Sequence, residues 1–361
     1  MSAERRIRVG VNGYGAIGKR VADAVLAQED MALAGVADVA TDWRPAVARE
    51  KHIELFGGDA EHASAMTRAG LEPAGELDDL LERVDVIVDC TPKRVGARNA
   101  QRYREAEVKF VLQGGEKHEV TGHSFVADAN YSEAVGLECT RVVSCNTTSI
   151  VRTLTALKRE GLLASARGTL LRRATDPWES HLGGIMNTVV PELTIPSHQA
   201  PDAQTVDPDL DVVTMAVKVP ETLAHVHFWC VRLARPAERE TALEALRSSS
   251  RIAFVRGDAG LGAINAIKEL AMDQGRRRGD VHEVVVWEDV LSVVGDELYY
   301  AYMVDNQAIV IPETIDAVRA LSGTEPSAEA SIRMTDAALG VRGGSWSVSP
   351  GGAGASAAVG R

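Results

Sequence analysis

The chain has 361 residues, of which 45% are hydrophobic, and its formal net charge is −12. A chain of this length can bury a sizeable core and favours two domains, and it contains no run of about 20 apolar residues that could span a membrane. The acidic balance disfavours nucleic acid and anionic membranes as partners.

The N-terminal residues lead directly into a strand-like run, which leaves no room for a signal peptide, so we expect a cytoplasmic protein. The four cysteines are Cys90, Cys139, Cys145 and Cys230. They are too few and too scattered for a disulfide framework, and none forms a CxxC pair of the kind that binds structural zinc. We therefore expect free thiols and no metal site.

Strand-like and helix-like segments alternate over the first 144 residues. Strands are expected over residues 7–11, 33–36, 84–88, 108–112 and 141–143, and the first helix over residues 19–28. This alternation predicts an α/β fold with a Rossmann-type, doubly wound parallel sheet. We assign residues 1–144 to this dinucleotide-binding domain.

The pattern changes after about residue 165, where the expected strands become longer and several alternate with a period of two. They cover residues 212–219, 225–233, 282–287 and 298–304. Such strands predict a mixed α+β catalytic domain over residues 145–305, with a largely antiparallel sheet.

The C-terminal part of the chain divides into a helix and a tail. Residues 312–321 have helical spacing and are expected to pack back on the first domain, to which we assign residues 306–322. Residues 323–361 are rich in Ser, Gly and Ala, which predicts a partly disordered C-terminal tail.

A glycine-rich turn separates the first strand from the first helix, with the sequence Gly13-Tyr14-Gly15-Ala16-Ile17-Gly18. In a G-x-G-x-x-G turn the first glycine permits the tight turn, the second admits a pyrophosphate to the backbone, and the third permits close packing of helix on strand. Glycines also mark ordinary turns, but here the motif has a strand before it and a helix after it. We predict that Gly13, Gly15, Ala16, Ile17 and Gly18 bind a dinucleotide.

Asp38 follows Gly18 by twenty positions and ends the second expected strand. A carboxylate there can accept hydrogen bonds from the adenine ribose hydroxyls and would repel a 2′-phosphate, which favours NAD over NADP. Asp42 is close enough in sequence to be a rival for this role, and an ordinary loop aspartate is the alternative interpretation.

Cys145 stands where an expected strand gives way to a helix, with Thr147 or Thr148 as the expected N-cap. The positive end of a helix stabilises thiolate over thiol, and a thiolate can attack an aldehyde. A buried structural cysteine is the alternative, and packing is the better interpretation for the other three cysteines, which lie in or against apolar strands.

His225 and His227 alternate in an expected strand and would face the same side of a sheet. Either could be the base that activates the thiol, and a His-x-His metal pair is the competing interpretation. Arg172-Arg173 and Ser197-His198-Gln199 are candidates for holding phosphate oxygens.

Taken together, these residues resemble the archaeal-type (type II) glyceraldehyde-3-phosphate dehydrogenases, over roughly residues 7–321. The blocks that carry the resemblance are residues 11–21, Gln113-Gly114-Gly115-Glu116-Lys117-His118, residues 144–148, Arg172-Arg173-Ala174-Thr175-Asp176-Pro177, residues 214–220, residues 222–227 and residues 311–317. Several blocks in the right order are far more specific than any one of them.

The resemblance implies a two-domain homotetramer that oxidises glyceraldehyde 3-phosphate with inorganic phosphate to 1,3-bisphosphoglycerate, a reaction of glycolysis and gluconeogenesis. NAD is the expected cofactor, with NADP as the alternative. Cys145 would be the nucleophile, forming a hemithioacetal and then a thioester, and His225 would assist by accepting a proton. The implied substrate contacts are Ser144, Asn146, His198 and Gln199, and the implied cofactor contacts are Gly115, Arg173 and Asn306.

Four departures from the family pattern bear on substrate and cofactor. Ala37-Asp38 replaces residues suited to a 2′-phosphate, which supports NAD. His198-Gln199-Ala200 replaces a pair of histidines followed by glycine, and Ser149 replaces a glycine. Asp305-Asn306-Gln307 replaces His-Gln-Glu. Two other functions therefore stay open: a related semialdehyde or acyl-phosphate dehydrogenase, and a dinucleotide-binding sensor without turnover.

Overall fold

In the computed structural model, which describes residues 6–113, 115–182 and 184–346, the N-terminal strands form a seven-stranded sheet. Its strands are β1 (Ile7–Asn12), β2 (Met31–Asp38), β3 (Leu55–Gly57), β4 (Val86–Asp89), β5 (Lys109–Leu112), β6 (Ser124–Phe125) and β7 (Cys139–Val142). Their spatial order is β3-β2-β1-β4-β5-β7-β6 and every pair is parallel. The predicted doubly wound sheet is therefore confirmed.

Seven helices connect these strands: α1 (Ala16–Leu26), α2 (Trp43–Glu50), α3 (Ala60–Arg68), α4 (Leu77–Leu81), α5 (Val95–Glu105), α6 (His118–Thr121) and α7 (Ala127–Ala134). The direction in which the strand order runs reverses between β1 and β4. In open α/β sheets, ligands bind at the carboxyl ends of the strands at such a switch point. The glycine-rich turn after β1 lies at this place.

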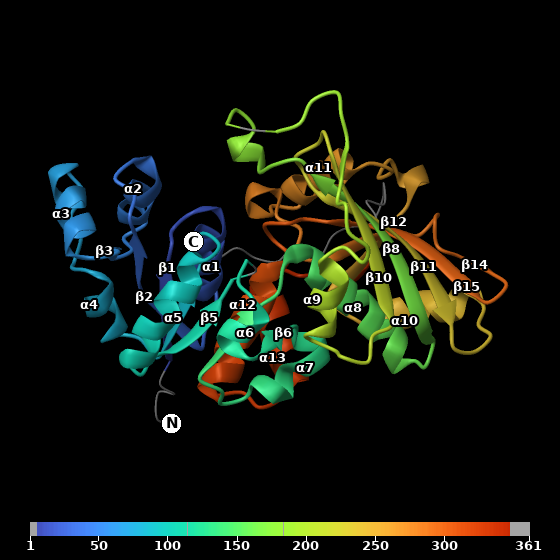
Figure 1. The fold of residues 1–361 in the computed structure, drawn as a ribbon, viewed down its shortest axis with the longest axis horizontal. Coiled ribbons are helices and arrows are strands. Elements are labelled where there is room, and N and C mark those ends of the chain that lie inside the picture. The colour runs from blue at the N-terminus through green and yellow to red at the C-terminus, as the bar shows by residue number, and fades with distance from the viewer. Residues whose placement is uncertain (1–5, 114, 183, 347–361) are drawn as a thin grey trace.

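The second sheet has nine strands and lies beside the first (Figure 1). They are β8 (Leu163–Arg173), β9 (Val190–Pro191), β10 (Val212–Val219), β11 (His225–Leu233), β12 (Ile252–Val255), β13 (Val284–Trp287), β14 (Ser292–Val294), β15 (Glu297–Val304) and β16 (Gly344–Ser345). Strand β11 is antiparallel to both β8 and β15, whereas β8–β10, β12–β13 and β12–β16 are parallel pairs. The sheet is mixed, as predicted.

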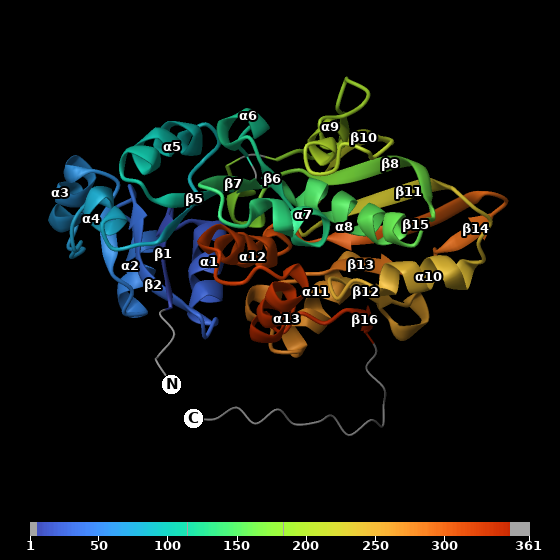
Figure 2. The same cartoon turned by 90° about the horizontal axis from the view of Figure 1, so that it is seen from below.

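The remaining helices are α8 (Cys145–Arg159), α9 (Gln199–Gln204), α10 (Arg239–Arg247), α11 (Ile264–Asp273), α12 (Val310–Ser322) and α13 (Ala328–Leu339), with short 3₁₀ turns at Pro177–Glu179, Gly257–Ala259 and Arg277–Gly279. Helices α8 and α10 pack together on one face of the second sheet (Figure 2). Alternate residues of β11 are buried on that face, and Phe228 is exposed on the other. Within the described part of the chain, no helix is long and apolar enough to cross a membrane.

Helix α12 lies between the two sheets and packs against β4, β5, β7, α1 and α7. All of its residues from Val310 to Leu321 are buried. The predicted tail is wrong from residue 323 to residue 346, because α13 packs on α12 and β16 pairs with β12. Residues 347–361, the rest of the predicted tail, lie outside the described residues.

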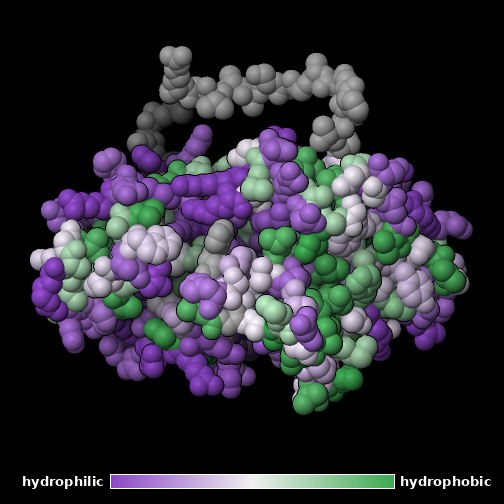
Figure 3. Space-filling model, turned by 90° about the horizontal axis from the view of Figure 1, so that it is seen from above, coloured by the Kyte–Doolittle hydropathy of each residue, from purple (hydrophilic) through white to green (hydrophobic). Residues whose placement is uncertain are grey.

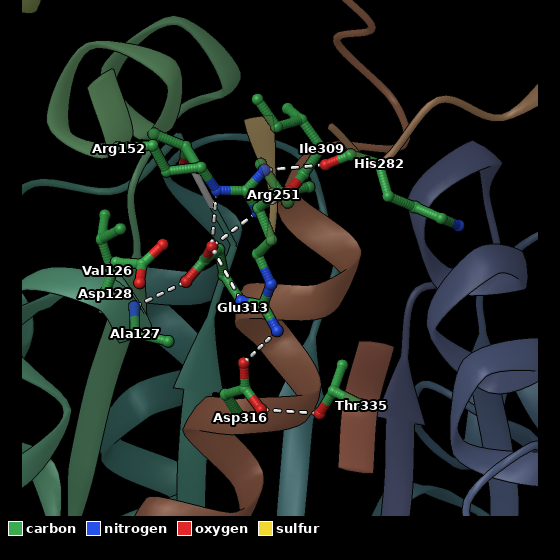
Figure 4. Close-up of polar contacts among 12 residues, drawn as sticks. Val126, Ala127, Asp128, Arg152, Arg251, His282, Ile309, Glu313, Asp316 and Thr335 are labelled. Atoms are coloured by element: carbon green, nitrogen blue, oxygen red, sulfur yellow. Dashed lines mark hydrogen bonds and ion pairs between the residues drawn. The ribbon is translucent and has the colours of Figure 1, made fainter. Parts of the chain in front are cut away.

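A network of buried ion pairs surrounds α12 (Figure 4). Glu313 accepts hydrogen bonds from Arg152 at 2.6 Å, from Arg251 at 3.1 Å and from the backbone N–H of Ala127 at 2.6 Å. Arg251 also donates to Asp316 at 2.6 Å. The side chains of Arg152, Arg251, Glu313 and Asp316 are all fully buried. The network joins α7, α8, α12 and the residue that precedes β12, so it spans the boundary between the two sheets.

Burial alone would raise the pKa of Glu313, but the charges of Arg152 and Arg251 hold that pKa below its usual value. The pKa of Asp316 is raised, because burial outweighs the attraction of Arg251. Asp316 also accepts hydrogen bonds from Thr335 and Ser331 of α13, at 2.6 and 2.7 Å. These contacts help to explain why α13, a helix poor in large apolar side chains, packs on α12.

We predict that Arg251→Met lowers the free energy of unfolding by about 3–5 kcal/mol, because it leaves buried carboxylates without their cation. The matched control is Arg256→Met, on the residue that follows β12, where the arginine is exposed and pairs with exposed Asp258. Thermal unfolding at equal protein concentration should show a much lower Tm for the first variant and an unchanged Tm for the second. Equal Tm values for the two variants would contradict this role.

Candidate active site

The glycine-rich turn has the geometry that a pyrophosphate requires. Gly13 has φ +92°, and a Cβ on it would lie 2.9 Å from the backbone of Cys90, so only glycine fits. A Cβ on Gly18 would lie 1.8 Å from the carbonyl oxygen of Gly13. At Gly15, by contrast, a Cβ would meet no atom within 4 Å, and no described side chain caps α1. The N–H groups of Ala16 and Ile17 in the first turn of α1 are therefore open to an anion.

Asp38 lies against this turn at the end of β2. Its carboxylate accepts hydrogen bonds from the backbone N–H groups of Tyr14 at 2.7 Å, Val39 at 2.7 Å and Ala40 at 2.8 Å. Its rival, Asp42, instead caps α2 by accepting the N–H of Arg44 at 2.9 Å and forms an ion pair with the Arg44 side chain. Asp38 is the aspartate that the fold brings to the glycine-rich turn.

Cys145 is the first residue of α8 and is partly buried. The N-cap is Ser144, whose hydroxyl accepts the N–H of Thr147 at 3.3 Å, so the prediction of Thr147 or Thr148 as the cap was wrong by three or four residues. Burial raises the pKa of the Cys145 thiol to about 11, while the charge of Arg173 and the N–H of Asn146 act in the opposite direction. Burial therefore raises the pKa of the thiol by more than the N-terminus of α8, which the sequence predicted, lowers it.

Arg173 contacts His225, and its positive charge also acts on the thiol of Cys145. Its backbone N–H donates to Nδ1 of His225 at 3.0 Å, and its guanidinium forms an ion pair with Asp176 at 3.1 Å. Burial lowers the pKa of His225 well below its usual value, and the positive charges of Arg172 and Arg173 lower it further. Since Nδ1 is an acceptor, the neutral ring carries its proton on Nε2.

His227 has a role that sequence reasoning missed. It is fully buried, with Nε2 2.9 Å from Oδ1 of Asn146 and Nδ1 3.0 Å from the hydroxyl of Tyr302. Burial lowers its pKa to about 3, so the ring is neutral and fixes the orientation of Asn146. Both histidines lie on the buried face of β11, and the two-residue spacing was the only sequence signal for this arrangement.

The predicted phosphate-holding residues are brought together only in part: Arg172 and His198 form a cluster with Glu192, with Gln199 next to His198 in the chain, whereas the guanidinium of Arg173 pairs with Asp176. Glu192 joins Arg172 and His198, at 3.3 Å and 3.0 Å. Fully buried Gln199 accepts a hydrogen bond from Ser197 at 2.7 Å. Two buried donors, Nε of Arg172 and Nε2 of Gln199, have no acceptor among the described residues. Buried donors without partners are uncommon, and a water or an anion from outside the chain can supply the missing acceptor.

Asp202 holds this cluster beside the thiol. It lies on α9, three residues after Gln199, and accepts hydrogen bonds from Thr147 of α8 at 2.7 Å and from Arg141 of β7 at 2.5 Å. The charge of Arg172 on β8 contributes to the lowered pKa of His225 and of His227, and it partly opposes the rise in the pKa of Cys145. Two distant parts of the sequence thus meet at the start of α8.

The other implied cofactor contacts lie at strand ends. Gly115 is exposed just beyond the carboxyl end of β5, where a Cβ would lie 3.2 Å from Lys93. Asn306 is partly buried in the turn between β15 and α12. Its neighbour Gln307 donates a hydrogen bond to Asp176, the partner of Arg173. Gly115 therefore lies near the carboxyl ends of the strands in the first sheet. Asn306 lies next to Gln307, which contacts the Asp176–Arg173 pair.

Comparison with known proteins assigns both halves of the chain. Residues 144–289 match the model of the glyceraldehyde 3-phosphate dehydrogenase C-terminal domain, and residues 7–118 match that of the dihydrodipicolinate reductase N-terminus. Both matches agree with the two sheets.

Similar full-length proteins come from several archaea. The chain is 43% identical to the glyceraldehyde-3-phosphate dehydrogenase of Methanobrevibacter smithii, over 92% of this chain and 99% of that protein. It is 44% identical to the protein of that name from Metallosphaera sedula, over 93% and 98%, and 43% identical to that from Haloarcula marismortui, over 93% and 94%. The chain therefore belongs to the glyceraldehyde-3-phosphate dehydrogenase family.

Proposed function

We propose that this chain oxidises glyceraldehyde 3-phosphate to 1,3-bisphosphoglycerate, with inorganic phosphate and with NAD in preference to NADP. The observation that carries the proposal is the hydrogen bond from Arg173 to His225, with the positive charge of Arg173 also acting on the thiol of Cys145. Two buried donors without an acceptor, on Arg172 and Gln199, supply the anion site. A nucleophile and an anion site are the two parts that a phosphorylating aldehyde oxidation needs. The names of the relatives support the substrate.

In the proposed reaction the sulfur of Cys145 bonds to the aldehyde carbon and the thiol proton leaves to solvent. The carbonyl oxygen becomes an oxyanion, which Nε2–H of His225 and the amide of Asn146 are suited to stabilise. When bound, NAD supplies the hydride acceptor that converts the adduct to a thioester. An oxygen of inorganic phosphate then attacks the thioester carbon, the C–S bond breaks, and the acyl phosphate leaves.

His225 acts in this scheme as a donor rather than as the proton acceptor that the resemblance implies. Its Nδ1 already accepts the N–H of Arg173, and a lowered pKa keeps the ring neutral near pH 7. A ring in that state has a proton to donate from Nε2 and no free lone pair on nitrogen. Such a donor stabilises an oxyanion. The oxyanion carries no hydroxyl proton, so it can lose hydride to the cofactor without first losing a proton.

The cofactor and phosphate contacts follow from the same geometry. Gly13, Gly15 and Gly18 with the open first turn of α1 would hold the pyrophosphate, and Asp38 the adenine ribose. Arg173, Gly115 and Asn306 would face the nicotinamide end. Arg172, His198 and Gln199 would hold phosphate oxygens, with Ser144 and Asn146 beside the reacting carbon.

We expect Cys145→Ser to lower kcat by at least about a thousandfold, because a hydroxyl cannot replace the thiol as nucleophile and leaving group. NADH formation from glyceraldehyde 3-phosphate, followed by absorbance, should require phosphate or arsenate in the unaltered protein. Turnover without either anion, or turnover that survives the substitution, would rule out the thioester route.

Asp38→Ser should raise kcat/KM for NADP relative to NAD by about tenfold or more, which corresponds to about 1.4 kcal/mol. The substitution removes the charge that repels a 2′-phosphate, and the cations Lys19 and Arg44 lie close enough for their pKa values to respond to Asp38. Asp42→Ser is the matched control and should leave the preference unchanged. If Asp42→Ser raised the use of NADP relative to NAD and Asp38→Ser did not, the ribose contact would belong to Asp42.

We also propose that the chain assembles as a homotetramer through the face of the second sheet that carries no helix. Met215 and Phe228 are 50% and 47% exposed on it, and Tyr299 and Val294 are exposed nearby. Hydrophobic residues gather over this half of the molecule (Figure 3). Contiguous apolar patches of this kind mark association surfaces.

Light scattering should give four times the chain mass, and Phe228→Glu should yield smaller species because it places a charge on this surface. A monomeric unaltered protein would contradict the proposal.

A further inference from the structure

Glu192 is an acidic side chain inside the cluster to which we assign phosphate. It follows β9, and its backbone N–H donates to the carbonyl oxygen of Ala216 at 2.8 Å, which anchors it to β10. One carboxylate oxygen accepts the backbone N–H of His198 at 3.0 Å and lies 3.0 Å from Nδ1 of the same residue. The other oxygen accepts from Nη1 of Arg172 at 3.3 Å.

These are the contacts that a phosphate oxyanion would make. A carboxylate and a phosphate both bind guanidinium, imidazole and backbone N–H donors through charge-assisted hydrogen bonds. The cluster also has donors that Glu192 does not reach, because Nε of Arg172 and Nε2 of Gln199 are buried without an acceptor in the described part of the chain. Glu192 therefore fills the site incompletely.

The charge of Glu192 opposes any incoming anion. Burial alone would raise its pKa, but the hydrogen bonds from His198 and the charge of Arg172 hold the pKa below its usual value, so the group is ionised at neutral pH. A phosphate dianion that approached Arg172 would meet a full negative charge at hydrogen-bond distance. Both anions cannot occupy these donors together.

We propose that Glu192 is an internal competitor for phosphate, which occupies Arg172 and His198 in the free protein and leaves them when phosphate binds. The backbone of Glu192 is fixed by β10, so the exchange needs only rotation of a side chain that is 24% exposed. The consequence is an affinity for phosphate that is weaker than the donor set alone would give. The inference rests on the proposed function for the identity of the ligand.

A second role for Glu192 predicts the opposite sign. If Glu192 served to orient His198 and Arg172 for phosphate, its removal would weaken phosphate binding. The direction of the change thus separates competition from positioning.

The experiment compares Glu192→Gln with the unaltered protein in titrations with inorganic phosphate at constant ionic strength, by calorimetry or by the shift in Tm. Glutamine keeps the size of the side chain and removes its charge. We expect the dissociation constant of phosphate to fall about tenfold, and the KM for phosphate to fall in the same proportion. Glu244→Gln makes the same charge change on an exposed position of α10 and should leave both values unaltered.

An unchanged or larger dissociation constant in Glu192→Gln would overturn the proposal. Glu192→Ala provides a second variant, which should also bind phosphate more tightly, and a loss of binding in it would favour positioning and count against competition. The equilibrium titration does not need turnover. If the protein bound phosphate but did not oxidise glyceraldehyde 3-phosphate, the proposed function would fail while the result for Glu192 would still stand.

Discussion

The arrangement of the two sheets depends on the buried carboxylate of Glu313, which pairs with Arg152 of α8 and with Arg251, the residue before β12. A carboxylate in such a place is tolerated only while its cations and N–H donors stay with it, since breaking a buried pair exposes the full desolvation penalty. Arg152 lies on α8, seven residues after Cys145 and so two turns along the same helix. The contact that joins α12 to α8 therefore also helps to place the helix that begins at Cys145.

Buried polar groups have partners in the ion-pair network around α12, whereas some of those in the candidate active site have none among the described residues. Around α12, each charged group named above has partners, and Asp316 even receives two hydroxyl donors from α13. In the cluster beside Cys145, buried donors of Arg172 and Gln199 lack acceptors, although burying them without one costs about 1–3 kcal/mol each. Buried charges are thus paired in the first region, whereas the second keeps two buried donors that have no acceptor among the described residues.

Much of this could be predicted from the sequence because the relevant signals are local. The bounds of β10 and β11 match the prediction residue for residue, since their alternation is strong. Strand β8 was missed, because its buried positions include Gly168, which leaves room for the Trp229 ring of the neighbouring strand. Helix α13 was taken for a tail because Ser331 and Thr335 face buried charges rather than an apolar core. Those partners are distant in the chain, and no spacing rule reveals them.

The protonation of the Cys145 thiol also depends on one feature that the sequence shows and one that only the fold shows. Position at the start of α8 favours a thiolate, and this much is visible in the sequence. Burial opposes it, and the resulting pKa of about 11 leaves Cys145 protonated in the free protein. Neutral His225, with Nδ1 occupied by the Arg173 N–H, cannot take that proton without losing the contact. In the proposed reaction, nucleophilic attack and loss of the thiol proton would therefore be coupled, with Arg173 and Asn146 stabilising the charge on sulfur as it develops.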